Sequence, residues 1–216
     1  MRYDSVIFDL DGTLLDTLGD LASGVNHMRE VCGLEPLSED LVKGNIGYGV
    51  ANLIKWSFPE YTDEDKINEI TDGFKAYYSE HMTEKTHVYD GIFDILDELD
   101  RRDIKYAVVT NKFHAAAKKI VEQYFGDRIS CVIGDGNGYA KKPAPDAVWA
   151  AIEMLGRKKE DSIYVGDSEA DVKTARNSLL PCLCVTWGLR SKEMLLEHSP
   201  DFIIDSPEEF FSVLDK

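Results

Sequence analysis

Short apolar runs alternate with amphipathic segments from residue 90 onward, and this alternation restricts the fold more than any other feature. The segment GIFDILDELDRRD places Ile92, Ile95, Leu96 and Leu99 on one helical face, and the strand-like run KYAVVTN follows and ends at polar residues. The same order recurs in AAAKKIVEQYF with SCVIGDG, PDAVWAAIEMLG with SIYVGDS, and EADVKTARNS with LPCLCVTWG. The pattern predicts an α/β fold with a doubly wound parallel sheet covered by helices on both faces.

The N-terminal half interrupts this alternation. YDSVIFD reads as a first strand and brings the expected total to about six strands. Residues 17–85 then show only helical patterns, which predicts an inserted α-helical cap domain at 17–85 and a core domain made of 1–16 plus 86–216. An insertion after a strand's carboxyl end lies over the ligand crevice of an open sheet, so we expect a lid, although an ordinary helical subdomain would give the same pattern.

Polar clusters follow four predicted strands at their carboxyl ends. Singly, each has an ordinary explanation, such as a turn at Asp11 and Gly12 or a helix cap at Asp167. Together they would gather several carboxylates at one sheet edge, which is costly unless a divalent cation and a lysine offset the charge. The sequence therefore predicts a site for Mg²⁺ and phosphate. The clusters are Asp9 with Asp11, Thr110 with Asn111, Lys142, and Asp167 with Asp171.

The charge balance limits the possible partners. The chain of 216 residues has 40 acidic and 24 basic residues and a formal net charge of −16, which disfavours nucleic acid and anionic membranes. A small phosphorylated metabolite is the expected partner, in a locally cationic site. The sequence shows no signal peptide, no membrane-spanning run and no disulfide or zinc pattern among its four cysteines, so we expect a cytoplasmic protein, as a monomer or a homodimer.

The ordered motifs resemble those of the haloacid dehalogenase superfamily of phosphohydrolases. The matching segments are DLDGT, VVTN, Lys142 in KKPAP, and GDSEAD, and the resemblance covers essentially the whole chain. The insertion after the first motif resembles the subfamily with a small helical cap, and DGTLLDTLGDL and GNIGYGVANLI are most similar to phosphoglycolate phosphatases. The resemblance implies a Mg²⁺-dependent phosphohydrolase that cleaves a small phosphomonoester, such as phosphoglycolate, through an aspartyl-phosphate.

The resemblance also implies roles for the two aspartates of the first motif. Asp9 is the expected nucleophile, because a carboxylate is ionised at neutral pH and needs no activating base. The Asp9 side chain, the Asp11 carbonyl and Asp167 are the expected Mg²⁺ ligands. Asp171 is either a further ligand or the group that holds Lys142 and the metal-bound waters. Asp11 is expected to donate a proton to the leaving oxygen and then to act as base for the attacking water.

The phosphate would be held by the remaining motif residues. Lys142 supplies a compensating charge; its neighbour Lys141 is the alternative, but the position before Pro143 favours Lys142. The Thr110 hydroxyl and the Asn111 main-chain N–H would bind phosphoryl oxygens, and Gly12 would let backbone N–H groups approach closely.

In the cap, Lys43, Asn45 and Tyr48 surround the glycine-rich turn KGNIGYG, which could enter the crevice and contact substrate or could be purely structural. Three other functions remain open. A phosphosugar mutase of the β-phosphoglucomutase type has a histidine at the start of the cap, where this chain has Asp20 and Leu21. An inorganic pyrophosphatase would share the same cap. A phosphoacceptor signalling module would use similar residues but place its aspartate on a middle strand and lack a cap.

Overall fold

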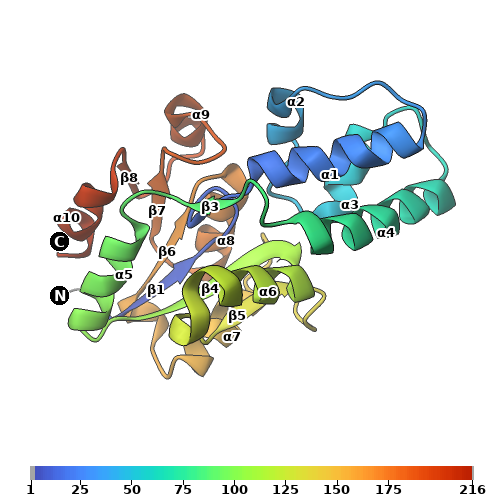
Figure 1. Cartoon of the computed structure of the whole chain (residues 1–216). Helices are drawn as coiled ribbons and strands as arrows, with labels where there is room; N and C mark the ends of the chain where they lie inside the picture. The colour runs from blue at the N-terminus through green and yellow to red at the C-terminus, as the bar shows by residue number, and fades with distance from the viewer. Residues whose placement is uncertain (1–2, 216) are drawn as a thin grey trace.

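The computed structural model describes residues 3–215 and is built around a six-stranded sheet in the order β5-β4-β1-β6-β7-β8 (Figure 1). Every pair of neighbouring strands in this sheet is parallel. The predicted α/β class and strand number are confirmed. The strands are β1 (Ser5–Phe8), β4 (Lys105–Phe113), β5 (Val132–Asp135), β6 (Ser162–Gly166), β7 (Cys182–Val185) and β8 (Phe202–Ile204).

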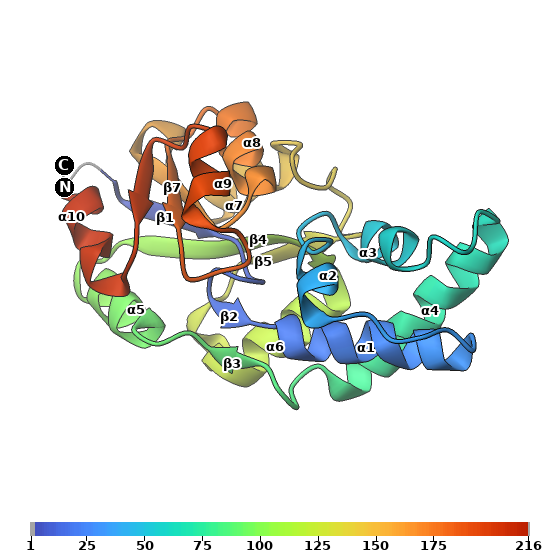
Figure 2. The ribbon, with the colours of Figure 1, turned by 90° about the horizontal axis from the view of Figure 1, so that it is seen from above.

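Helices cover both faces of the sheet (Figure 2). On β1, Val6 and Phe8 point into one hydrophobic cluster and Ile7 into the other, as the two-residue period of a strand requires. The first cluster contains side chains of α5 (Ile92–Arg101), α6 (His114–Phe125) and α10 (Phe210–Leu214). The second contains side chains of α7 (Asp146–Met154), α8 (Glu169–Ser178) and α9 (Lys192–Glu197). Short 3₁₀ helices η1, η2 and η3 lie at Gly126–Arg128, Lys159–Asp161 and Pro207–Glu209.

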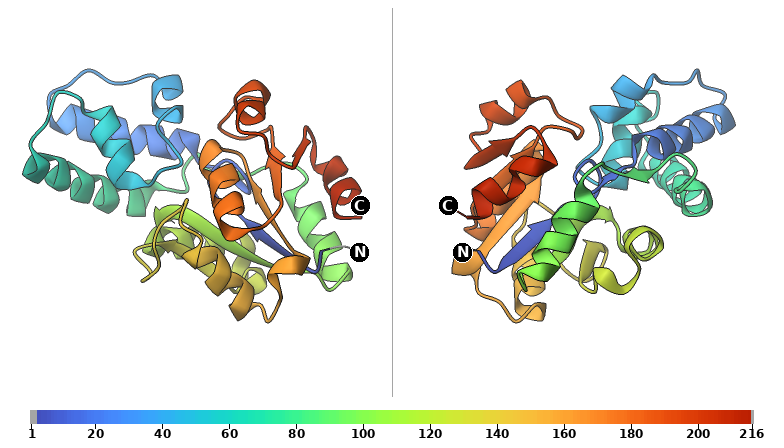
Figure 3. Two further views of the ribbon diagram at one scale, coloured as in Figure 1. Left: turned by 180° about the vertical axis from the view of Figure 1, so that it is seen from behind. Right: turned by 60° about the vertical axis from the view of Figure 1, so that its left-hand side comes forward.

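The expected helical insertion lies beside the sheet as a separate group of helices (Figures 1 and 3). It consists of α1 (Leu18–Val31), α2 (Glu39–Lys43), α3 (Val50–Ser57) and α4 (Glu64–His81). Within the helical patterns of the insertion, the segment from residue 38 to 56 forms two helices, α2 and α3, and not one continuous helix. The division falls where Gly47 and Gly49 adopt positive φ angles of 118° and 86°, which a side chain would disfavour.

A short antiparallel ribbon connects the insertion to the sheet domain. It pairs β2 (Leu15–Asp16) with β3 (His87–Val88), and two-residue strands are too short to leave a periodic signal in the sequence. Asp20 secures the return of the chain, because its carboxylate accepts hydrogen bonds from the Lys85 and Thr86 main-chain N–H groups and the Thr86 hydroxyl. The ribbon therefore holds side by side the two crossings of the chain, which are the segments that enter and leave the insertion.

Strand β4 is longer than the sequence suggested. The apolar run was expected to end at Thr110 and Asn111, but β4 continues to Phe113, with a register irregularity between Val109 and Phe113, and α6 begins only at His114. The expectation of a strand end at Asn111 is therefore wrong, and neither Thr110 nor Asn111 caps a helix. The extension places Lys112 on the strand, beside the candidate site.

Candidate active site

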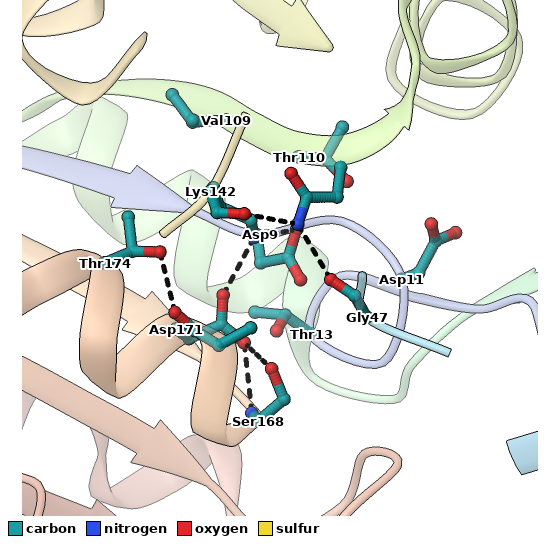
Figure 4. Close-up of polar contacts among 12 residues, drawn as sticks. Asp9, Asp11, Thr13, Gly47, Val109, Thr110, Lys142, Ser168, Asp171 and Thr174 are labelled. Atoms are coloured by element: carbon teal, nitrogen blue, oxygen red, sulfur yellow. Dashed lines mark hydrogen bonds and ion pairs between the residues drawn. The ribbon is translucent and has the colours of Figure 1, made fainter. Parts of the chain in front are cut away.

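A buried lysine joins two of the predicted carboxylates (Figure 4). The Lys142 Nζ atom lies 2.8 Å from Asp9 Oδ1 and 2.8 Å from Asp171 Oδ1, and it donates a hydrogen bond of 3.0 Å to the Tyr164 hydroxyl. Burial acts to lower the pKa of Lys142, but the Asp171 and Asp9 carboxylates outweigh it and raise that pKa above its ordinary value. Lys142 is therefore a charged ammonium group inside the protein.

Asp167 follows β6 and is fully buried. Its Oδ1 accepts a hydrogen bond of 2.8 Å from the Thr13 hydroxyl, and its Oδ2 accepts one of 2.7 Å from the Leu189 main-chain N–H. Burial, followed by repulsion from the Asp171 and Asp9 carboxylates, raises the pKa of Asp167 well above its ordinary value. The hydrogen bonds fix the side chain in a place where its charge is poorly stabilised.

Asp171 lies in the first turn of α8 and forms a capping box with Ser168, which excludes Asp167 as the cap of this helix. Its Oδ2 accepts hydrogen bonds from the Ser168 N–H (3.0 Å), the Ser168 hydroxyl (2.6 Å) and the Asp167 N–H (3.2 Å). Its Oδ1 contacts Lys142 and Tyr164. Both oxygens are occupied, so the geometry favours the role of holding Lys142 and the turn at Asp167.

The donor set fits a hard divalent cation. One carboxylate oxygen from each of Asp9, Asp167 and Asp171 lies within 4.8 Å of the others. Burial raises the pKa of Asp9 to about 7, against the lowering effect of Lys142. Apart from the ion pair with Lys142, Asp9 Oδ1 has no hydrogen-bond partner within residues 3–215. Oxygen ligands with excess negative charge suit Mg²⁺, which binds few carboxylates and completes its shell with waters and phosphate oxygens.

Two glycines make room for this arrangement. A Cβ atom on Gly12 would lie 2.3 Å from Asp167 Oδ2, and one on Gly188 would lie 2.2 Å from the Gly12 carbonyl oxygen. Gly12 also has a φ angle of 90°. Any larger residue would displace the Asp167 carboxylate, so Gly12 serves close packing around the candidate metal site.

Asp11 points away from the cluster around Lys142 (Figure 4). Its Oδ1 accepts a hydrogen bond of 2.9 Å from Lys112 Nζ, which also donates one of 2.7 Å to the Tyr78 hydroxyl on α4. Burial acts to lower the pKa of Lys112, but Asp11 and Tyr78 more than offset this effect and raise that pKa. Sequence reasoning missed Lys112, although it directly follows Asn111 in VVTNK.

A cavity of about 40 Å³ lies between the cap and the carboxyl ends of the strands, and its wall brings Asp9, Asp11, Thr110 and Asn111 together. The Asn111 side-chain amide donates to the Gly47 carbonyl of the cap at 2.9 Å and to the Lys142 carbonyl at 3.1 Å. The cap contributes backbone and apolar side chains to the cavity. The lining residues from the insertion are Leu21, Ile46, Gly47, Gly49, Val50, Leu53, Phe74 and Tyr78.

The glycine-rich turn therefore reaches the crevice, but the three side chains selected in it do not line the cavity. Lys43 takes part through its carbonyl oxygen, which accepts a hydrogen bond from Arg190. Tyr48 packs edge-on against Trp56, and burial and the nearby Glu169 carboxylate raise its pKa. Substrate contact by Lys43, Asn45 or Tyr48 stays a prediction.

Arg190 is a second residue that sequence reasoning missed. Its buried guanidinium donates from Nε to Glu169 Oε2 at 2.9 Å and from Nη2 to the Ile46 carbonyl at 2.8 Å. Arg190 therefore ties the loop after β7 to the turn of the cap. A lone arginine in TWGLR carries no signal of this contact, because its acceptors in the cap are main-chain carbonyls far away in the sequence.

A model of the family described as haloacid dehalogenase-like hydrolase matches residues 6–185. The chain belongs to this family of hydrolases. It is 36% identical to a phosphoglycolate phosphatase of Agrobacterium fabrum over 92% of this chain and 87% of that protein. It is 28% identical to an N-acetylmuramic acid 6-phosphate phosphatase of Pseudomonas aeruginosa over 100% of this chain and 96% of that protein.

Solved structures agree with this assignment. A protein from Lactobacillus delbrueckii subsp. bulgaricus that is predicted to be a phosphoglycolate phosphatase superposes with a TM-score of 0.93 at 32% identity, over 99% of both chains. A protein from Haemophilus somnus with the same predicted activity gives 0.89 at 25% identity, over 99% of this chain and 98% of that chain. The resemblance seen in the motifs is confirmed over nearly the full length, cap included.

Proposed function

We propose that the protein is a Mg²⁺-dependent phosphohydrolase that cleaves a small phosphomonoester, phosphoglycolate or a similar compound, through an aspartyl-phosphate on Asp9. The observation that carries the proposal is the buried cluster of Asp9, Lys142, Asp167 and Asp171 beside a small cavity under the cap. Phosphatase names among the relatives support it, and the Agrobacterium fabrum protein supports the substrate.

In the proposed first step, a carboxylate oxygen of Asp9 attacks phosphorus and the bond from phosphorus to the ester oxygen breaks. Asp11 gives its proton to the departing oxygen. This role suits the position of Asp11 on the cavity wall, on the side of Lys112 and Tyr78 and away from Lys142. Thr110 and Asn111 are proposed to bind the phosphoryl oxygens from the same wall.

In the second step, Asp11 takes a proton from a water molecule, and the resulting oxygen attacks phosphorus. The bond between phosphorus and Asp9 breaks, which releases phosphate and restores the carboxylate. Lys142 stays paired with Asp171 and offsets the negative charge beside Asp9 throughout. Mg²⁺, when bound by Asp9, Asp167 and the Asp11 carbonyl, would supply electrostatic stabilisation of the phosphoryl group. Asp171 is proposed to support this site, directly or through Lys142.

Residues 17–85, which contain helices α1–α4, are proposed to act as a lid over the carboxyl ends of the strands. The two crossings of the chain at the β2–β3 ribbon provide a narrow connection, and residues of both cap and core form the cavity wall. A mutase is less well supported, because Leu21 is apolar and Asp20 is already bound to Lys85 and Thr86. No helix among residues 3–215 is long and apolar enough to cross a membrane.

Phosphate release from p-nitrophenyl phosphate, with and without Mg²⁺, tests the proposal first. A panel of phosphoglycolate, sugar phosphates, nucleotides and pyrophosphate then ranks substrates by kcat/KM. We expect Mg²⁺-dependent hydrolysis with phosphoglycolate among the best substrates. If pyrophosphate were the only compound hydrolysed, the result would instead support a pyrophosphatase. No turnover of any compound would contradict the proposal.

A further inference from the structure

Lys112 is a buried cation that the proposed reaction leaves without a role. Its side chain is only 3% exposed, and its ammonium group contacts Asp11 at 2.9 Å and the Tyr78 hydroxyl at 2.7 Å. It also lies 4.6 Å from the centre of the Tyr78 ring. Tyr78 belongs to α4, so Lys112 connects the core to the cap at the edge of the cavity.

The cavity wall makes this charge distinctive. Among the described residues that line the cavity, Lys112 alone has a basic side chain, while Asp9 and Asp11 are acidic. Most of the remaining wall is apolar, and it is formed by Leu21, Ile46, Val50, Leu53, Phe74 and Phe113. An anionic group on a substrate would be repelled by the Asp9 carboxylate and by the overall charge of −16, unless it binds to Lys112.

An ammonium group has three N–H donors, and two of those of Lys112 have partners in the structure. The third is free to bind a ligand atom. Asp11 stands next to the ester oxygen in the proposed reaction, so Lys112 lies on the leaving-group side of the cavity. Because Lys112 and Asp11 are in contact, a leaving group must be short if its ester oxygen is to lie beside Asp11 and its far end beside Lys112.

We infer that Lys112, with the Tyr78 hydroxyl, is a specificity-determining pair that binds a carboxylate on a short leaving group. The inference rests on the proposed phosphohydrolase function and deepens it. The favoured substrates are phosphate esters of small hydroxy acids. Esters of neutral alcohols or amides of the same size leave the buried ammonium without its additional partner, and they are turned over less efficiently.

Two esters that differ only in charge provide the test. We compare kcat/KM for 2-phosphoglycolate and for its neutral amide, 2-phosphoglycolamide, with Mg²⁺ present. Wild-type protein should prefer the carboxylate by about 10- to 100-fold, the effect expected of a charge-assisted hydrogen bond. In Lys112→Met this preference should fall to about threefold or less. The ratio is informative because any disturbance of Asp11 affects both substrates alike.

Two further variants separate recognition from a structural role. Lys55→Met removes an exposed cap lysine that does not line the cavity, and it should keep the wild-type preference. Tyr78→Phe removes only the hydroxyl and should reduce the preference by a few-fold, which keeps the test valid if Lys112→Met does not fold. An unchanged preference in Lys112→Met, or in Tyr78→Phe if only that variant folds, would overturn the inference.

The wild-type protein distinguishes failure of the inference from failure of the proposed function. Efficient hydrolysis of both esters at equal kcat/KM would leave the phosphohydrolase proposal standing and would refute the carboxylate site. Hydrolysis of neither ester, together with no turnover of the wider substrate panel, would refute both.

Discussion

Lys142 Nζ and Asp171 Oδ1 lie 2.8 Å apart, and both side chains are almost completely buried. The same nitrogen contacts Asp9 at 2.8 Å, so one ammonium group offsets two carboxylates. Removal of one member of a buried ionic cluster leaves the others unpaired, which costs far more than the loss of a surface pair. The relation makes Lys142 central to stability as well as to the proposed reaction.

Lys142→Met should therefore lower the free energy of unfolding of the metal-free protein by about 3 to 5 kcal/mol. Urea unfolding with a chelator present measures this change. Lys141→Met is the matched control, since Lys141 is exposed, and it should change the free energy by less than about 0.5 kcal/mol. Equal stability of the two variants would contradict the buried ionic cluster.

The effect of Mg²⁺ on stability should depend on pH. Asp9 has a pKa of about 7 in the metal-free fold against an ordinary value of 3.8, so the folded protein binds more protons between these values. Its contribution to stability therefore falls as the pH rises from about 4 to 7. Mg²⁺ binds the deprotonated carboxylate, so the increase in Tm on adding Mg²⁺ should be larger at pH 8 than at pH 6. A Tm increase that is independent of pH would contradict Asp9 as a ligand.

Asp11→Asn should lower kcat by about 10²- to 10⁴-fold, the contribution typical of a general acid and base. Stabilisation by Mg²⁺ should persist, because the proposed metal contact of Asp11 is through its main-chain carbonyl. Steady-state kinetics and thermal unfolding with Mg²⁺ check both parts. A variant with wild-type kcat would rule out the proton-transfer role, and loss of the Mg²⁺ effect would show that the Asp11 side chain contributes to metal binding.

Arg190→Gln should loosen the cap turn, because the Arg190 guanidinium donates to the carbonyls of Ile46 and Lys43. We expect faster amide exchange in residues 43–49 and a KM raised by about tenfold, since the turn forms part of the cavity wall. Lys192→Gln, which removes an exposed pair with Asp205, is the control. Unchanged exchange in the turn of Arg190→Gln would show that Arg190 does not hold the cap.

The sheet and the carboxylate cluster could be predicted from sequence for a physical reason. Parallel strands end at one edge, so Asp9, Lys142 and Asp167 had to lie near one another once the alternation of strands and helices was recognised. Cys182 and Cys184 alternate along β7, so the two-residue period of a strand predicts one shared face, and their sulfur atoms lie 3.8 Å apart in the core.

The contacts between cap and core could not be predicted. In the cap, Arg190 binds main-chain carbonyls, which every residue possesses. The hydrogen bond from Lys112 to the Tyr78 hydroxyl forms only because α4 lies against β4 in the fold. Neither pairing leaves a local pattern. The β2–β3 ribbon has two residues per strand, which is too short for a period to be visible. Local periodicity predicted the elements, while the fit of the cap on the core emerged only in three dimensions.

The most direct test of the central proposal is to locate the phosphoryl group during turnover. Acid quenching of the protein with phosphoglycolate and Mg²⁺, followed by borohydride reduction and peptide mass spectrometry, converts an aspartyl-phosphate to homoserine at the modified position. We predict homoserine at position 9, and neither modification nor turnover in Asp9→Asn. Modification at another aspartate, or wild-type turnover by Asp9→Asn, would contradict Asp9 as the nucleophile.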